Sequence, residues 1–205
     1  MTEEKVIINS GKIRLEGLMK ILPGDRGAVV THPHPLYGGD MHNNVVEAVC
    51  RAYQEKGYST LRFNFRGVGQ SEGGYEEGIG EQDDVGAALD YLSDMGKEEI
   101  DLAGYSFGSW VNALGINRYK KVKRIIMISP PVDLMDFSCL INNPKIMLVI
   151  TGSEDEIADH RSVKEVIPSW NREAIFKVIN GADHFYWSNT GDLQKIIGEF
   201  LEQDQ

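Results

Sequence analysis

The chain has 205 residues, 41% of them hydrophobic and 25% charged, and a formal net charge of -10 at pH 7. This length predicts one domain, residues 1–205, with a core large enough to need no disulfide or metal for its stability. The acidic balance opposes binding to nucleic acid and to anionic lipid, and no apolar run approaches the roughly 20 residues of a membrane span. We therefore expect neither nucleic acid nor a membrane as a partner.

The cysteines and the first residues bear on the cellular compartment. Cys50 and Cys139 are far apart and belong to no C-x-x-C pattern, which favours a reducing environment. The opening residues Met-Thr-Glu-Glu-Lys lead into no apolar segment of the kind found in a secretory signal. We expect a cytoplasmic protein. No feature of the sequence indicates an oligomeric state.

The predicted secondary structure begins with a hairpin and continues as alternating strands and helices. Residues alternate between apolar and polar over Lys5–Asn9 and Ile13–Leu22, which predicts two antiparallel strands around a tight turn. Apolar runs typical of buried strands follow at Gly27–Thr31, Ser59–Phe65, Ile100–Ala103, Val122–Ile128, Ile146–Ile150 and Ala174–Ile179. Helices are predicted over Asn43–Lys56, Glu81–Asp94, Phe107–Ile116, Ser162–Ile167 and Asp192–Leu201.

This alternation predicts an α/β fold, a doubly wound and mostly parallel sheet of about eight strands with helices on both faces. In such sheets a ligand binds beyond the carboxyl ends of the strands. Loops of unusual composition follow several predicted strands, among them His32-Pro33-His34-Pro35 and the glycine-rich segment Arg66–Gly74. We therefore expect the functional site at this edge of the sheet.

The most informative motif is Gly104-Tyr105-Ser106-Phe107-Gly108, a Gly-x-Ser-x-Gly pattern between a predicted strand and a predicted helix. Such a turn strains the serine backbone and brings strand and helix so close that side chains at either glycine would clash. It presents the serine hydroxyl in the open, and the amide of Phe107 can donate to a developing oxyanion. The pattern indicates a nucleophile elbow.

A serine hydroxyl is a weak nucleophile at neutral pH, so Ser106 needs a histidine as base and a carboxylate to orient it. His184 follows the last predicted strand and lies at the expected edge of the sheet. His42, expected to open the first helix, and His160 are better explained as solvated or capping residues. Asp155, after the strand at 146–150, is the expected acid, and the chain order Ser, Asp, His is typical of such triads.

Other carboxylates leave the choice of the acid open. Glu154, Glu156 and Asp159 lie in the same loop as Asp155, and a change of one residue in the loop geometry would point a different one at the histidine. Asp133, after the preceding strand, is a further candidate. An acidic loop that only keeps the protein soluble is the alternative without a catalytic role.

With these motifs the chain resembles the α/β-hydrolases over nearly its whole length, in particular the small, lidless serine hydrolases related to dienelactone hydrolases and serine aminopeptidases. The resemblance rests on five segments, His32–Gly39, Asn64–Ser71, Gly104–Gly108, Gly152–Asp155 and Gly181–His184. It implies an α/β-hydrolase fold without a cap domain and a Ser-His-Asp triad. Dienelactone hydrolases use a cysteine nucleophile where this chain has Ser106, so their own activity is not expected.

The resemblance also implies an oxyanion hole. In the family, the residue after a His-Gly pair in the loop after the third strand gives the second oxyanion amide. Here Pro33 replaces the glycine, so by position His34 is the donor that acts with Phe107. Leu36 and Tyr37 are alternatives to His34.

Two motifs suggest other chemistry, and their spacing argues against it. The glycines within Arg66–Gly74 have neither the spacing nor the following helix of a dinucleotide site. His32, His34, Asp40 and His42 could hold zinc or manganese, but known metallohydrolase signatures are tighter and the elbow would be left unexplained. We therefore expect no metal and no cofactor.

The interval between the strands near Ile128 and Ile146 is too short for the lid that shapes the pocket in many α/β-hydrolases. We expect a shallow, open pocket with walls of loop side chains, namely Tyr37, Trp110, Met135, Phe137, Phe185 and Trp187. Tyr37, Trp110 and Phe185 are the expected substrate contacts, although Trp110 and Met135 could equally belong to the core. Such a cleft suits a small acyl ester or thioester. A peptidase or acyltransferase with the same triad, or a binding protein without catalysis, are the alternatives.

Overall fold

The computed structural model describes residues 2–203, which contain an eight-stranded sheet in the order β1-β2-β4-β3-β5-β6-β7-β8. The hairpin strands β1 and β2 form one end of it, and β2 runs antiparallel to both β1 and β4. The remaining neighbouring strands pair in parallel. The strands are β1 (Glu4–Ser10), β2 (Ile13–Lys20), β3 (Arg26–Thr31), β4 (Ser59–Phe63), β5 (Glu99–Tyr105), β6 (Val122–Ile128), β7 (Ile146–Gly152) and β8 (Ile175–Ile179). The predicted sheet is thus confirmed.

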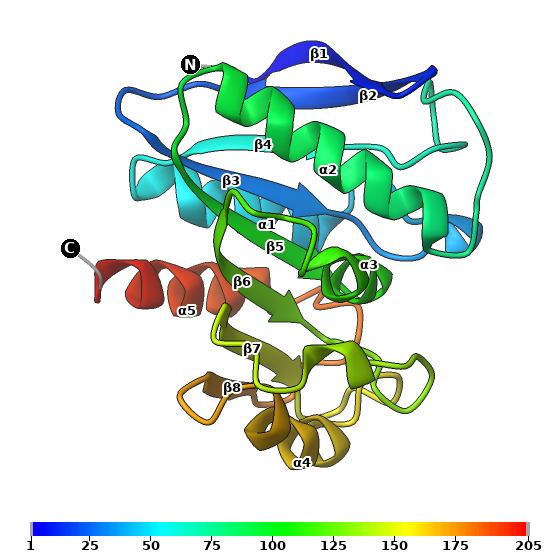
Figure 1. Ribbon diagram of the computed structural model, residues 1–205. Coiled ribbons are helices and arrows are strands. Elements are labelled where there is room, and N and C mark those ends of the chain that lie inside the picture. Colours follow the sequence, from blue (N-terminus) through cyan, green and yellow to red (C-terminus); the bar gives the residue numbers. More distant parts are fainter. Residues whose placement is uncertain (1, 204–205) are drawn as a thin grey trace.

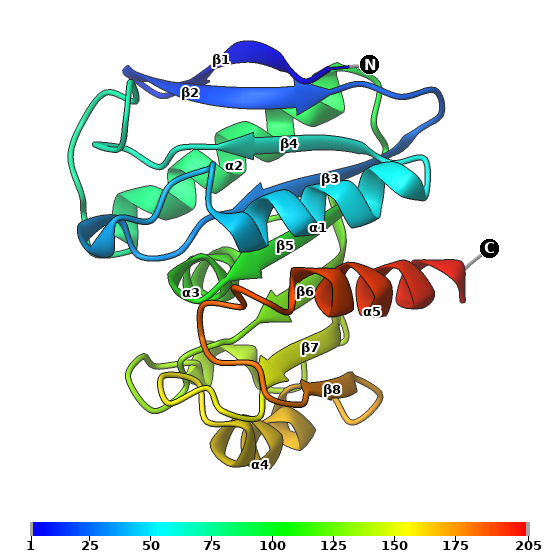
Figure 2. The ribbon, with the colours of Figure 1, turned by 180° about the vertical axis from the view of Figure 1, so that it is seen from behind.

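Helices cover both faces of the sheet. On one face α2 and α3 lie in front of the strands (Figure 1), and on the other face α1 and α5 lie side by side (Figure 2). The helices are α1 (Asn44–Glu55), α2 (Ile79–Asp94), α3 (Phe107–Gly115), α4 (His160–Trp170) and α5 (Thr190–Glu202). Two short 3₁₀ turns, η1 (Pro35–Tyr37) and η2 (Ser138–Leu140), lie in loops. Among residues 2–203, no helix is both long and apolar enough to cross a membrane.

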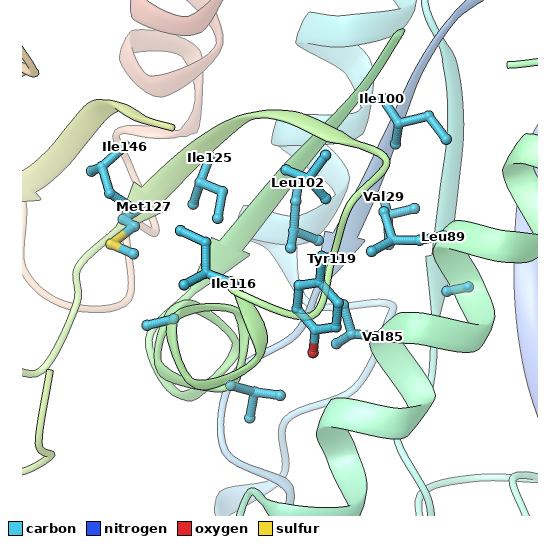
Figure 3. Packing of buried hydrophobic residues seen from close by; sticks show 14 of the residues in the cluster. Val29, Val85, Leu89, Ile100, Leu102, Ile116, Tyr119, Ile125, Met127 and Ile146 are labelled. Carbon is cyan, nitrogen blue, oxygen red and sulfur yellow. The ribbon is translucent and has the colours of Figure 1, made fainter. Parts of the chain in front are cut away.

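The core consists of two hydrophobic clusters, one on each face of the sheet. Val29 points toward α2 and α3, whereas its neighbours Ala28 and Val30 point toward α1 and α5. Successive strand residues face opposite sides, and both sides are covered, so central strands are apolar without alternation. Figure 3 shows the first cluster, where side chains of β3, β5 and β6 meet Val85 and Leu89 of α2.

Three helices, α2, α4 and α5, are longer than the sequence pattern predicts. α2 begins at Ile79 because the Glu81 side chain accepts a hydrogen bond of 2.8 Å from the amide of Gly78, which caps the helix. α4 begins at His160, where Asp159 accepts from the second helical amide, and it continues through Pro168 to Trp170. His42 does not open α1, whose first residue is Asn44. These differences affect only the ends of the elements.

No lid separates the sheet edge from solvent in the described part of the chain. Residues 129–145, between β6 and β7, contain only the short turn η2. The loops that follow β3, β5, β6, β7 and β8 all lie at the carboxyl ends of the parallel strands. The expectation of a fold without a cap domain is therefore confirmed.

Candidate active site

The elbow holds Ser106 in a strained conformation between β5 and α3. Its backbone angles are φ 54° and ψ -117°, a region that a residue with a side chain rarely adopts. A Cβ atom at Gly104 would lie 2.7 Å from the backbone of Gly108, and one at Gly108 would lie 2.7 Å from the carbonyl oxygen of Thr31. Only glycine fits at either position, so the predicted close approach of strand and helix is confirmed.

Three side chains from distant loops meet in one line of hydrogen bonds. The Nε2 atom of His184 lies 3.0 Å from the Oγ atom of Ser106, and its Nδ1 atom lies 2.9 Å from both carboxylate oxygens of Asp155. The carboxylate can only accept, so Nδ1 carries the proton and Nε2 accepts from the serine. All three side chains are buried, with exposures of 8% for Ser106, 7% for His184 and 4% for Asp155.

The surroundings of Asp155 favour its ionised form. Its Oδ1 atom accepts from the amides of Ile157 and Ala158, at 3.0 and 2.7 Å, and its Oδ2 atom accepts from the Ser129 hydroxyl at 2.6 Å. Burial acts to raise the pKa of the Asp155 carboxyl, but the hydrogen bonds and the charge of His184 hold that pKa below its usual value. The group is therefore a carboxylate across the neutral range.

None of the other candidate acids forms a hydrogen bond with the histidine in the described part of the chain. Glu154, Glu156 and Asp133 are exposed, and Asp159 caps α4. Asp155 alone of the five has a hydrogen bond to His184 among the described residues. The structure thus places the predicted acid, and not its neighbours, beside the predicted base.

Both ring nitrogens of His32 are bound to the protein backbone. The Nε2 atom accepts from the amide of Phe65 at 3.0 Å, and the Nδ1 atom donates to the carbonyl of Pro33 at 2.7 Å. No ring nitrogen is left for a metal. Within residues 2–203, no group of three or more His, Cys, Asp or Glu side chains is arranged to hold a metal ion. The role of His32 is to tie the loop after β3 to the end of β4.

The burial of His32 leads to a prediction about stability. Desolvation lowers the pKa of His32 to about 4, whereas in the unfolded chain it is about 6.5. Between these values the unfolded chain binds a proton that the folded chain does not, so stability falls as the pH falls. From pH 7 to pH 5 this contribution is about 2 kcal/mol. Urea unfolding at both pH values should show that His32→Gln loses less stability than the wild type by this amount; equal losses would contradict the assignment.

The glycine-rich loop after β4 is held by its own polar side chains. Arg66 forms a two-pronged ion pair with the buried Asp84 of α2, at 2.8 and 3.0 Å. Asn64 accepts from the amide of Met41 and donates to Glu16. These contacts provide hydrogen-bond partners for the buried side chains of Arg66 and Asn64. It is a structural loop that joins β2, β4 and α2 behind the site.

The predicted pocket residues differ in their exposure. Tyr37, Phe185 and Trp187 are 89%, 50% and 74% exposed, and the Phe185 ring lies 5.9 Å from that of His184. Trp110 packs on the core and donates from its ring nitrogen to the carbonyl of Asp136 at 2.9 Å. Tyr37 lies in the loop after β3, Phe185 and Trp187 lie in the loop after β8 that carries His184, and Trp110 lies in α3.

Phe137 does not line the pocket, so this expectation from the sequence is wrong. It is only 5% exposed, and its ring lies 5.4 Å from the ring of Trp170 in α4. It belongs to the core and not to the wall of a pocket. Met135 likewise packs against this core cluster. The segment after β6 folds back onto α4, which a local pattern of apolar residues does not reveal.

An open cleft of about 570 Å³ lies beside the histidine and the acid. It is lined by His184, Asp155, Phe185 and the loop after β7. A larger cavity, of about 680 Å³, lies between the β1–β2 turn and α2 and contains none of the three side chains described above. The cleft therefore adjoins the base and the acid, whereas Ser106, Tyr37 and Trp110 are not among the residues that line it.

Several residues of this site were not found from the sequence. Ser129 donates to Asp155 and is hydrogen-bonded to Tyr186, and Tyr105 donates from its hydroxyl to the carbonyl of His184 at 2.6 Å. The Tyr75 hydroxyl lies 3.3 Å from the Nε2 atom of His34. Only Ser129 could have been suspected from the sequence, because it directly follows a predicted strand and precedes two prolines.

The sheet, its helices on both faces and the serine elbow after β5 define an α/β-hydrolase fold. No model of a known protein family matches the chain. An uncharacterised protein of Rickettsia prowazekii is 35% identical over 209 residues, covering 96% of this chain and 88% of that protein. The chain belongs to the α/β-hydrolase superfamily, in the group of small α/β serine hydrolase homologues without a lid.

Two solved structures of that group are similar to this chain. An α/β serine hydrolase homologue from Coxiella burnetii is 33% identical, with a TM-score of 0.89 and coverage of 98% of both chains. An α/β serine hydrolase without a lid from Xanthomonas campestris is 29% identical, with a TM-score of 0.90, and the match covers 99% of this chain and 95% of that one. The predicted superfamily is thus confirmed.

Proposed function

We propose that the protein is a serine hydrolase that cleaves a small carboxylic ester or thioester through an acyl-enzyme. The observation that carries the proposal is the hydrogen-bonded line from Ser106 through His184 to Asp155 at the end of a strained elbow. A protein that only binds a ligand has no need of this strain, which costs on the order of 1–3 kcal/mol. The alternative of a binding protein without catalysis is less consistent with this geometry.

In the proposed cycle His184 removes the proton of Ser106 as the serine oxygen attacks the carbonyl carbon of the substrate. Asp155 stabilises the imidazolium that forms and holds its orientation. The imidazolium then protonates the leaving alcohol or thiol, and the acyl group stays on Ser106. A water molecule activated by His184 hydrolyses the acyl-enzyme and restores the serine. The cycle uses this chain's residues and water, without a cofactor.

Two backbone amides are proposed to stabilise the oxyanion, those of Phe107 and His34. Phe107 is the first residue of α3, and the first amides of a helix have no acceptor within the helix. In the other loop, the amide of Leu36 donates to the His34 ring and that of Tyr37 donates to the His34 carbonyl. These bonds occupy both alternative donors and support His34 as the second one.

The rim of the site supports a small acyl substrate. Tyr37 and Phe185 offer exposed aromatic surface beside His34 and His184, and α3 contributes Trp110. Aromatic rings contact acyl chains through apolar burial, and the open cleft leaves room for varied leaving groups. Because specificity lies in pocket shape, a peptidase or an acyltransferase with the same triad is separated from an esterase by substrate panels.

A fluorophosphonate probe tests the proposed nucleophile directly. Incubation of the purified protein is expected to label Ser106, as read by mass spectrometry of its peptides, because the probe reacts with activated serines. Labelling should vanish in Ser106→Ala and His184→Ala and persist in His160→Ala, which removes a histidine outside the site. A folded wild-type protein that takes up no label would overturn the proposal and favour a binding function.

A further inference from the structure

Two buried residues beside Asp155 adopt a backbone conformation that is unfavourable for their type. Ser129, directly after β6, has a φ of 46°, and Tyr186, between β8 and α5, has a φ of 55°. Both have 0% exposure. A positive φ is uncommon for any residue other than glycine and a genuine outlier for a bulky one. Specific contacts must therefore hold both residues in place.

These contacts form a chain of hydroxyl groups that ends on Asp155. The Tyr186 hydroxyl lies 2.7 Å from the Oγ atom of Ser129, which lies 2.6 Å from the Oδ2 atom of Asp155. The carboxylate only accepts, so Ser129 donates its single proton to Asp155, and Tyr186 must donate to Ser129. Burial raises the pKa of the Tyr186 phenol, which keeps the proton on this donor.

We propose that Tyr186 and Ser129 are positioning residues, a hydroxyl relay that orients Asp155 toward His184 and stabilises its negative charge. The inference rests on the roles of Asp155 and His184 in the proposed function. Ser129 reaches the carboxylate from β6, and Tyr186 belongs to the loop that carries His184. The relay therefore joins the loop of the base to the Oδ2 atom of the acid, one of the two carboxylate oxygens that His184 contacts.

The expected effect on the proton affinity of the Asp155–His184 pair has a definite sign. Without an extra proton the pair carries a net charge of one negative unit, which the donors to Asp155 stabilise; with a proton on the imidazole the pair is neutral overall. Loss of a donor therefore destabilises the unprotonated, active form. The pair then takes up a proton at higher pH, by about one pH unit for a buried donor to a charge.

Other titratable groups face the pair and remain in every variant. They are Tyr105 on β5, Glu154, Glu156 and Asp159 after β7, and Asp183 beside the histidine. Their charges act equally on the wild type and on the variants. A difference in midpoint between the wild type and a hydroxyl-deleted variant is therefore assigned to that hydroxyl.

The experiment measures the titration of His184 by NMR of protein that contains carbon-13-labelled histidine. The resonance that is missing from the His184→Ala spectrum identifies His184. Ser129→Ala is expected to move the midpoint upward by about one pH unit. Tyr186→Phe should move it upward by less, because Ser129 still donates to Asp155. Ser129→Gly, which removes the hydroxyl and also relieves the positive φ, should match Ser129→Ala.

A double variant separates a relay from two independent effects. Once Ser129 has lost its hydroxyl, Tyr186 has no route to Asp155, so Ser129→Ala/Tyr186→Phe should titrate like Ser129→Ala alone. Tyr119→Phe is the matched control, because it removes another buried tyrosine hydroxyl, one that donates to the Gln82 carbonyl at 2.9 Å. It should leave the midpoint unchanged. Additive shifts, or no shift in Ser129→Ala and Ser129→Gly, would overturn the relay.

The pH profile of kcat/KM for p-nitrophenyl acetate gives a second readout. Its acidic limb should move with the NMR midpoint, whereas a merely structural loss would lower the rate at every pH without moving the limb. The NMR titration needs no substrate, so the relay and the proposed function can fail separately. A shifted midpoint in a protein that takes up no fluorophosphonate would keep the relay and reject the hydrolase.

Discussion

Ser106→Ala is expected to lower kcat for ester hydrolysis by a factor on the order of 10⁶. The variant removes the oxygen that forms the acyl-enzyme, while the amides at the start of α3 and the cleft remain. These leave only the weak catalysis that binding and oxyanion contacts supply. The rate of p-nitrophenyl acetate hydrolysis checks the prediction. It is measured with protein that has been purified free of the expression host's own esterases.

Two controls accompany this measurement. Ser138→Ala removes an exposed serine outside the site and should keep the wild-type rate. Alanine at position 106 keeps the strained φ of the elbow, so the stability of the variant should stay close to that of the wild type. A Ser106→Ala variant with a rate within tenfold of the wild type would show that another group attacks the ester.

Asp155→Asn is expected to lower kcat about 10⁴-fold. The amides of Ile157 and Ala158 hold the Oδ1 position, so the asparagine oxygen takes that place and its NH₂ group faces Ser129 and His184. Of the two contacts of 2.9 Å with the imidazole Nδ1–H, only the one with Oδ1 keeps an acceptor, and the side chain no longer carries the negative charge that stabilises the imidazolium. At the Oδ2 position the NH₂ group cannot accept and donates toward Nδ1 instead. It favours the wrong tautomer, which leaves Nε2 protonated and unable to accept from the serine.

The matched control for this prediction is Glu154→Gln. Glu154 directly precedes the acid, it is exposed, and its carboxylate has no hydrogen bond to His184 among the described residues. The variant should hydrolyse the ester at a rate within twofold of the wild type. A large loss in Glu154→Gln together with an active Asp155→Asn would reassign the acid within the same loop.

The order and type of the secondary-structure elements follow from local sequence patterns. Apolar periodicity and turn residues depend on neighbours in the chain, so the eight strands, the hairpin at the sheet edge and five helices could be predicted without coordinates. The same holds for the elbow, because its glycines are required by the close approach at Ser106. His184 could be chosen because it follows the last predicted strand, whereas His160 lies in a polar stretch with helical character.

Contacts between distant segments could not be predicted in this way. Four carboxylates competed with Asp155, and the choice among them depends on how the loop after β7 turns toward the loop after β8. Ser129 and Tyr186 are 57 residues apart in the chain, and they meet because β6 and β8 flank β7 in the sheet. Such contacts depend on strand order and on the direction of side chains within a packed interior, which no local pattern encodes.

The same distinction explains where the sequence analysis was wrong and where it stays a prediction. Phe137 was placed in the pocket because its local surroundings resemble a loop, but long-range packing on Trp170 buries it. The roles of Tyr37, Trp110 and Phe185 with a substrate remain predictions. Local chemistry thus specified the strands, the elbow and the reactive residue types, with Asp155 as the expected acid. The packed sheet decided between Asp155 and the competing carboxylates and placed hydroxyl groups beside it, because both depend on contacts between distant segments.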